Sequence, residues 1–124
     1  MAILTIEQMR EAHKIKAALN EAVLFLDDAQ RMKVTPVTQN LVSMYQAKRD
    51  KLQRQYQELL PSVDETLEQI DRMRPYTICR LYFREGFSYY QIAKILDGEQ
   101  NTIRQSANWA IDRVNRLAKK ESEE

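Results

Sequence analysis

Turn-forming residues are scarce in this chain of 124 residues, and this scarcity constrains its fold more than any other feature. The sequence holds two glycines and three prolines. β-Sandwiches and barrels need many tight turns, which are built from glycine and proline, so an all-β fold is nearly excluded. Two glycines twelve residues apart also cannot make a glycine-rich phosphate-binding loop. The sequence therefore predicts an all-α fold.

Helix boundaries can be read where the few breakers separate periodic segments. Thr5 and Gln8 have the spacing of a capping box, and the apolar positions that follow predict a helix of about 27 residues. Pro36 ends that helix, and a second amphipathic helix runs as far as Pro61. Two long helices joined by so short a link predict an antiparallel hairpin over residues 1–60.

Two helices cannot cover both of their own apolar stripes. The remaining apolar surface must meet the C-terminal part of the chain, another chain, or both. We expect this region to form a homodimer or a higher homo-oligomer. The alternative is a monomer in which the hairpin packs entirely on the C-terminal helices.

The C-terminal half, residues 62–120, is expected to form a second domain of shorter helices. Ser62 and Glu65 resemble a second capping box, which would open a helix ending near Met73. Ser88 and Gln91 have the spacing of a third box. Pro75 fits the first position of a helix. Further helices are predicted over residues 76–84, 89–96 and 100–119, with breaks at Glu85-Gly86 and Asp97-Gly98 and an acidic tail at 121–124.

Composition narrows the class of protein further. One cysteine and one histidine exclude an internal disulfide framework and are too few for a structural metal centre, so we expect no metal and no cofactor. The first residues lack a signal-peptide core, and the longest apolar run is too short to span a membrane. We therefore expect a soluble protein of a reducing, intracellular compartment. Residues 74–120 carry nine basic and four acidic side chains, a net charge of +5, which favours approach to a polyanion.

Residues 88–104 have the spacing of a helix-turn-helix. A short first helix carries small Ala93 at the crossing point, and apolar Ile92, Leu96 and Ile103 face that crossing. The second helix leaves a polar face at its N-terminal end, where Arg can pair with guanine and Asn or Gln with adenine. The residues predicted to read bases are Asn101, Thr102, Arg104, Gln105 and Asn108. Arg113, Arg116 and Lys119 are predicted to meet the phosphate backbone, and Ser88, Tyr90 and Gln100 are also predicted to bind DNA.

The run from Arg80 to Leu96, continued by residues 101–104 and by Trp109-Ala110, resembles the fourth conserved region of bacterial sigma factors. The similarity covers roughly residues 64–117. The long helical front is unlike any other sigma-factor region. In layout the chain is most similar to small phage-encoded late-gene activators of the ArpU and RinA type. This resemblance implies promoter-proximal DNA binding, contact with RNA polymerase, and a place in the cytoplasm of a bacterial host.

The turn departs from the sigma-like pattern at three consecutive positions. Members of that family usually have Gly where Asp97 stands, a buried aliphatic residue where Gly98 stands, and Ser or Thr where Glu99 stands. Glu caps a helix poorly, so the turn is open to re-registration by one residue.

Several single residues have structural interpretations. His13 is expected on a charged surface, Cys79 in the core, and Trp109 against Tyr82 or Phe83. Of the neighbouring Tyr89 and Tyr90, one is expected in the core while the other faces a phosphate. Adjacent carboxylates on the helices diverge by about 100° and have no base or nucleophile beside them, so no enzyme is predicted.

Taken together, these features predict a sequence-specific DNA-binding transcription regulator of phage or prophage origin, with the helix at 100–119 in the major groove. Three other functions stay open. The chain can bind RNA polymerase or a sigma factor without touching DNA alone. It can be a helical assembly protein whose basic segment pairs with residues 1–73. It can also be a DNA-packaging protein of the small-terminase type, which joins a helix-turn-helix to oligomerisation helices.

Overall fold

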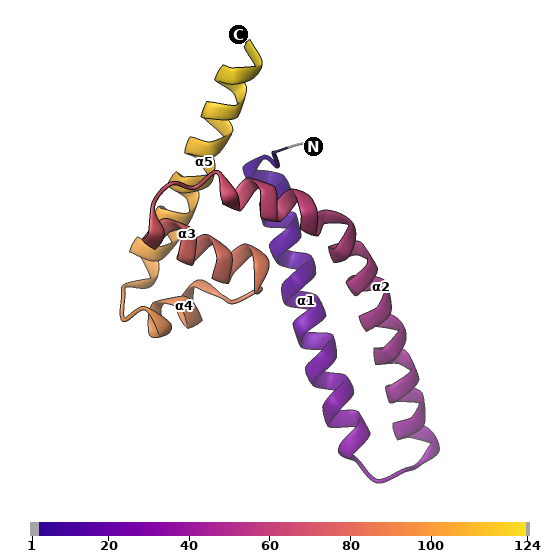
Figure 1. The fold of residues 1–124 in the computed structure, drawn as a ribbon. Coiled ribbons are helices and arrows are strands. Elements are labelled where there is room, and N and C mark those ends of the chain that lie inside the picture. The colour runs from indigo at the N-terminus through magenta and orange to yellow at the C-terminus, as the bar shows by residue number, and fades with distance from the viewer. Residues whose placement is uncertain (1–2, 124) are drawn as a thin grey trace.

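A computed structural model of the chain describes residues 3–123, so Glu124 of the predicted acidic tail lies outside the described residues. Every regular element in that range is helical (Figure 1). The prediction of an all-α fold is confirmed. The elements are α1 (Ile6–Arg31), α2 (Pro36–Glu68), α3 (Met73–Cys79), η1 (Arg80–Arg84), α4 (Tyr89–Ile95) and α5 (Gln100–Glu123).

The two long helices lie side by side and run in opposite directions (Figure 1). The capping box predicted at Thr5 and Gln8 is present: the Thr5 hydroxyl accepts from the Gln8 backbone N–H, and the Gln8 side chain accepts from the Thr5 N–H. A reciprocal pair of Thr35 and Thr38 opens α2, with Pro36 in its first turn. Both helices therefore begin where local hydrogen bonds satisfy donors of the first turn.

The prediction that the second helix ends at Pro61 is wrong, because α2 continues to Glu68 and changes direction in its C-terminal third (Figure 1). A proline inside a helix removes one backbone hydrogen bond, yet burial of Val63 and Leu67 holds the next two turns in place. Ser62 is consequently not a helix cap; its carbonyl accepts from the Thr66 hydroxyl at 2.7 Å. α2 thus runs across the boundary expected between residues 60 and 62.

One hydrophobic core joins the long helices to the C-terminal elements. The N-terminal half of α1 contributes Met9 and Ala12, and the C-terminal half of α2 contributes Tyr56. Cys79 is fully buried, as predicted. The other buried members of this core are Leu4, Val63, Leu67, Ile78, Phe83, Ile92, Ala93, Ile103, Ala107, Ala110 and Ile111.

The helix predicted over residues 76–84 begins earlier, at Met73, and its last turn, η1, is wider than an α-helix. The Glu85 N–H donates to the Arg80 carbonyl, five residues back. A chain reversal follows at Gly86, where φ is +79°. An added Cβ there would lie 2.7 Å from Asn20 Nδ2, so the close approach to α1 requires glycine.

Side chains of the long helices satisfy the carbonyl groups at the end of η1. The Tyr56 hydroxyl lies 3.1 Å from the Phe83 carbonyl and 3.0 Å from the Arg84 carbonyl. Asn20 Nδ2 donates to the Glu85 carbonyl at 2.9 Å. These are groups that a helix end leaves without internal partners, so the hairpin is both packed on the C-terminal elements and hydrogen-bonded to them.

His13 is half-buried at this junction, and the prediction of a surface histidine is wrong. Its Nδ1 lies 2.7 Å from the Tyr82 carbonyl, and its ring stacks on the Tyr82 ring at a centroid distance of 3.6 Å. Burial lowers the pKa of His13, with a smaller opposing effect from the carbonyl hydrogen bond. Tyr89 stacks on Tyr82 at 4.0 Å, and burial raises the pKa of Tyr89.

Away from this junction, the distal parts of α1 and α2 extend without other elements around them (Figure 1). We call residues 21–51 the arm and the remaining described residues the base. The arm buries three side chains, Ala22, Leu26 and Ala29, all of them on α1.

Candidate nucleic-acid interface

The candidate interface is built on α4, the turn after it and the N-terminal half of α5. Ser88 caps α4 as predicted: its hydroxyl accepts from the Gln91 N–H at 3.1 Å, and the Gln91 side chain accepts from the Ser88 N–H at 2.9 Å. Ile92 and Ala93 lie in the same core as Ile103. α4 and α5 are therefore held against each other by buried apolar side chains.

The turn between these helices is set by Asp97, which has a left-handed φ of 51°. The next N–H, that of Gly98, donates to the Ala93 carbonyl at 2.8 Å. The left-handed conformation thus falls at the position where sigma-like proteins usually have Gly. At Gly98 the constraint is space and not a left-handed backbone, because an added Cβ would lie 3.3 Å from Arg74 Nη2 and 3.3 Å from Ile103 Cδ1.

The polar face predicted at the start of α5 is exposed, while Ile103 and Ala107 on its other side are buried. Arg104 Nη2 donates to Asn101 Oδ1 at 2.6 Å, so these two side chains lie together on that face. The exposed residues of this face that are predicted to bind DNA are Gln100, Asn101, Thr102, Arg104 and Gln105.

Asn108 differs from the other predicted base-reading residues because it is half-buried. Its Oδ1 accepts from Arg10 Nη2 of α1 at 3.4 Å. Arg10 therefore stands beside the candidate face, a position that sequence reasoning missed. The two residues are 98 positions apart, and no local pattern connects them.

Arg113 is engaged within the molecule. Its Nη2 lies 3.2 Å from Asp71 Oδ2, and its guanidinium lies 5.6 Å from the centre of the Trp109 ring. Arg72 lies at the same distance from that ring. The prediction that Trp109 packs on Tyr82 or Phe83 is thus wrong: the indole is 41% exposed and lies against two arginines.

A shallow hollow of about 400 Å³ follows this flank of α5. It brings predicted residues Thr102 and Gln105 together with Arg72, Pro75 and Trp109, and Ser106 also lines it. Arg72 is a second cation near the candidate face that sequence reasoning did not select. Its net effect is reduced by Asp71, which pairs with Arg113 next to it.

The remaining residues predicted to bind DNA lie toward both ends of the interface. On α4, Tyr90 is 56% exposed, and Lys94 Nζ lies 4.5 Å from the centre of its ring. On α5, Arg116 and Lys119 are exposed in the half that projects past the core (Figure 1). Exposed Asp112 stands between Asn108 and Arg116 along the helix, so positive charge is interrupted there.

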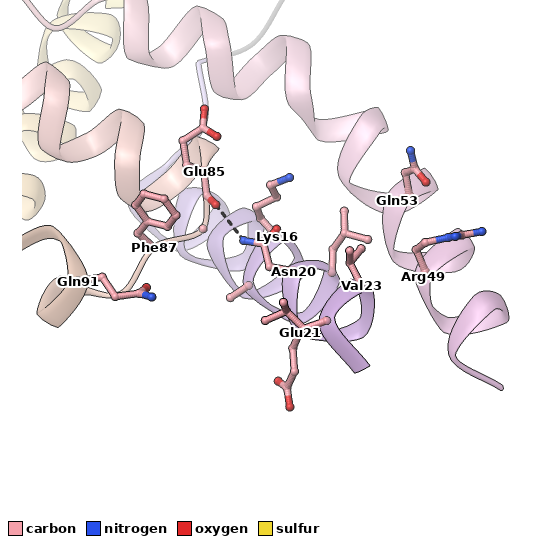
Figure 2. A pocket seen from close by; sticks show the side chains of 13 residues that line it. Lys16, Asn20, Glu21, Val23, Arg49, Gln53, Glu85, Phe87 and Gln91 are labelled. Atoms are coloured by element: carbon pink, nitrogen blue, oxygen red, sulfur yellow. Dashed lines mark hydrogen bonds between the residues drawn. The ribbon is translucent and has the colours of Figure 1, made fainter. Parts of the chain in front are cut away.

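A larger hollow of about 910 Å³ lies on the other side of the junction, between the long helices and the loop before α4 (Figure 2). Asn20 crosses its edge to the Glu85 carbonyl, and Phe87 and Gln91 lie beyond. The described residues that line it include no serine, threonine, cysteine or histidine, so it offers no hydroxyl or thiol nucleophile.

No protein-family model, curated protein or solved structure matches this chain. In residues 3–123, no three His, Cys, Asp or Glu side chains come together as metal ligands. None of the described helices combines the length and the apolar character needed to cross a membrane.

Proposed function

We propose that this chain is a sequence-specific DNA-binding transcription regulator without catalytic activity, in which α4, the turn and α5 form a sigma-like helix-turn-helix. The observation that carries the proposal is the start of α5, where consecutive polar side chains are exposed while Ile103 and Ala107 anchor the opposite side. A helix held in this way can enter the major groove without losing its packing.

In this account Arg104 reads guanine, and Asn101 and Gln105 read adenine, each through paired hydrogen bonds to the base edge. The bond between Arg104 and Asn101 is exchanged for base contacts on binding. Arg74, Lys94 and the hydroxyl of Tyr90 meet phosphates near the start of α5, and Arg116 and Lys119 meet them farther along. Arg113, paired with Asp71, holds α5 to the segment before α3.

The resemblance to sigma factors extends the proposal to a phage or prophage regulator that works in the cytoplasm of a bacterial host, near promoters and RNA polymerase. We propose that it acts as a homodimer or higher homo-oligomer, so that two copies of α5 face DNA. Dimeric helix-turn-helix proteins place their recognition helices about 34 Å apart, or at a multiple of that distance.

Selection from a random-sequence duplex pool, at about 50 mM and about 200 mM salt, tests this function. We expect an enriched motif whose binding weakens at the higher salt. Salt-sensitive binding without enrichment would contradict sequence reading and favour DNA packaging. Absence of binding at both salts, together with capture of purified polymerase, would contradict independent DNA binding.

A matched pair of variants controls for charge alone. Asn101→Asp with Gln105→Glu adds two negative charges to the candidate face, and we expect it to abolish enrichment. Gln39→Glu with Gln46→Glu adds the same charges to exposed positions on α2, and we expect enrichment to persist. Equal effects of the two pairs would place the interface elsewhere.

A further inference from the structure

The N-terminal part of α2 lacks the packing that a helix in a globular protein needs. None of its residues from Pro36 to Gln55 is buried. Exposed apolar side chains occur there instead, with Val37 at 68% and Met44 at 52%. Because most helical stability in proteins comes from burying an apolar face, this segment needs a covering surface that a single copy does not provide.

Four of the exposed apolar residues of α1 and α2 lie on one face of the arm, whereas exposed Val23 and Leu24 line the hollow on the other flank. Phe25 and Met32 are seven residues apart on α1, as are Val37 and Met44 on α2, so each pair spans two turns on the same side of its helix. The Phe25 ring lies 5.4 Å from the ring of Tyr45. Leu41 is four residues before Tyr45, four after Val37 and three before Met44, so this spacing joins the side of Tyr45 to the side of Val37 and Met44. We call Phe25, Met32, Val37, Leu41 and Met44 the arm face.

The arm face points away from the base. Asn20, which binds the loop after η1, is five residues before Phe25 and so lies about 140° around α1 from it. Arg49 and Gln53 line the hollow of Figure 2, on the same flank as Asn20. A second molecule can therefore cover the arm face without displacing α3, α4 or α5.

Charged residues form two borders beside this face. On α1, Glu21 and Asp28 of the arm and Lys14 of the base recur every seven residues along one edge, and Glu21 also lines the hollow of Figure 2. On α2, Lys48 continues the stripe of Val37, Leu41 and Met44, and Lys51 stands on the opposite edge. Within residues 21–51, as far as the structure describes them, the ion pairs are Asp27 with Arg31 and Arg49 with Asp50. Each pair lies within one helix, and none joins α1 to α2.

The contact between Phe25 and Tyr45 fixes the level of these charges. Glu21 is four residues before Phe25, and Lys48 is three after Tyr45, so the antiparallel helices bring them to the same level. By the same count, Lys14 lies near the level of Glu58 on α2. Glu21 and Lys48, and Lys14 and Glu58, thus have opposite signs at similar heights, whereas Asp28 has no charged residue at its level on α2.

We propose that the arm face is the interface with a second copy of this chain. A two-fold axis parallel to the helices stacks the two arms face to face, with α1 of each copy over α2 of the other. This arrangement brings Glu21 to Lys48, and Lys14 to Glu58, across the interface. The same patch is used on both copies, so the contact closes as a dimer and leaves no repeating surface. The proposal concerns the free protein and does not rest on DNA binding.

Sedimentation equilibrium of the full chain without DNA tests the interface. We expect a dimer, twice the 14.7 kDa of the chain. Val37→Glu with Met44→Glu should raise the dimer Kd at least about tenfold, because two unpaired carboxylates would be buried. Leu24→Glu is the matched control: Leu24 is 65% exposed on α1 and lines the other flank, so this variant should stay dimeric. A wild-type monomer at about 100 µM, or dissociation by Leu24→Glu alone, would overturn the proposal.

A charge reversal tests the register. Glu21→Lys should weaken the dimer several-fold, and adding Lys48→Glu should restore it. Restoration supports parallel arms with α1 over α2. If Lys48→Glu weakens the Glu21→Lys variant further, α1 does not face α2 of the other copy and the register is wrong. Circular dichroism on each variant confirms that the helices are kept.

Discussion

In the base, α1 and α2 are held to the C-terminal elements by a shared core and by hydrogen bonds from Asn20 and Tyr56 to carbonyl groups at the end of η1. In the arm the same two helices pair with each other away from the shared core, and α2 buries no side chain there. The difference shows that two continuous helices can serve two purposes. One part fixes the position of α4 and α5, and the other presents an apolar face.

Replacing one buried leucine by alanine in each region should show the largest difference in stability between the base and the arm. Leu67 in the base is 2% exposed and Leu26 in the arm is 4% exposed. Leu67→Ala should lower the free energy of unfolding by about 4 kcal/mol, because its surroundings cannot collapse, and Leu26→Ala by about 2–3 kcal/mol. Urea unfolding followed by circular dichroism measures both. A larger loss for Leu26→Ala would reverse the comparison.

The two glycines offer the next contrast. Gly86→Ala should cost about 2–4 kcal/mol, because φ is +79° and the new Cβ would lie 2.7 Å from Asn20 Nδ2 and 2.9 Å from Lys16 Cγ. Gly98→Ala should cost under about 1 kcal/mol, since the ends of Arg74 and Ile103 can shift. Thermal unfolding of both variants provides the test. A stability of Gly86→Ala equal to that of the wild type would contradict the close approach of Gly86 to α1.

Loss of one hydroxyl tests the hydrogen bonds of the junction. Tyr56→Phe should cost about 1–3 kcal/mol, because the carbonyls of Phe83 and Arg84 lose their donor. Tyr45→Phe in the arm should change stability by less than about 0.5 kcal/mol, since only its ring contact with Phe25 is used. Urea unfolding of both variants at one pH measures these changes. Similar losses of unfolding free energy would contradict the hydrogen-bonded junction between α2 and η1.

The smallest expected effect is a pH dependence carried by His13. Its pKa is below its ordinary value of 6.5 because the ring is half-buried, so the unfolded chain binds the proton more readily than the folded one. Its contribution to stability is complete above pH 6.5 and is lost as pH falls toward the lowered value. We expect under about 1 kcal/mol, reduced by partial solvent exposure.

Unfolding at pH 7.5 and 5.5 measures this slope. His13→Gln retains a donor for the Tyr82 carbonyl and should flatten the slope between these pH values. An unchanged slope in that variant would assign the pH dependence to other groups.

Local signals in the sequence predicted most of the helical elements. The boxes at Thr5 and Ser88 are present because each needs only residues within one turn. The same signal misled at Ser62, since burial of Val63 and Leu67 extends α2 through Pro61. The free energy gained by burying these two side chains exceeds the cost of the backbone hydrogen bond that Pro61 removes.

At the candidate interface, too, the sequence predicts features that depend on neighbouring residues and misses those that depend on distant ones. Exposure of Asn101, Arg104 and Gln105 follows from helical periodicity and was predicted. The positions of Arg10 and of Trp109 depend on residues far apart in the chain, which no periodic pattern encodes. The DNA-reading role of this face stays a prediction.

The measurement that tests the central claim most directly compares Arg104→Ala with Arg116→Ala on a selected duplex and on a scrambled duplex, at two salt concentrations. We predict that Arg104→Ala costs about 1–3 kcal/mol on the selected duplex and relaxes its preference. Arg116→Ala should weaken both duplexes alike and reduce the salt dependence. Equal behaviour of the two variants would contradict the assignment of base reading to the start of α5.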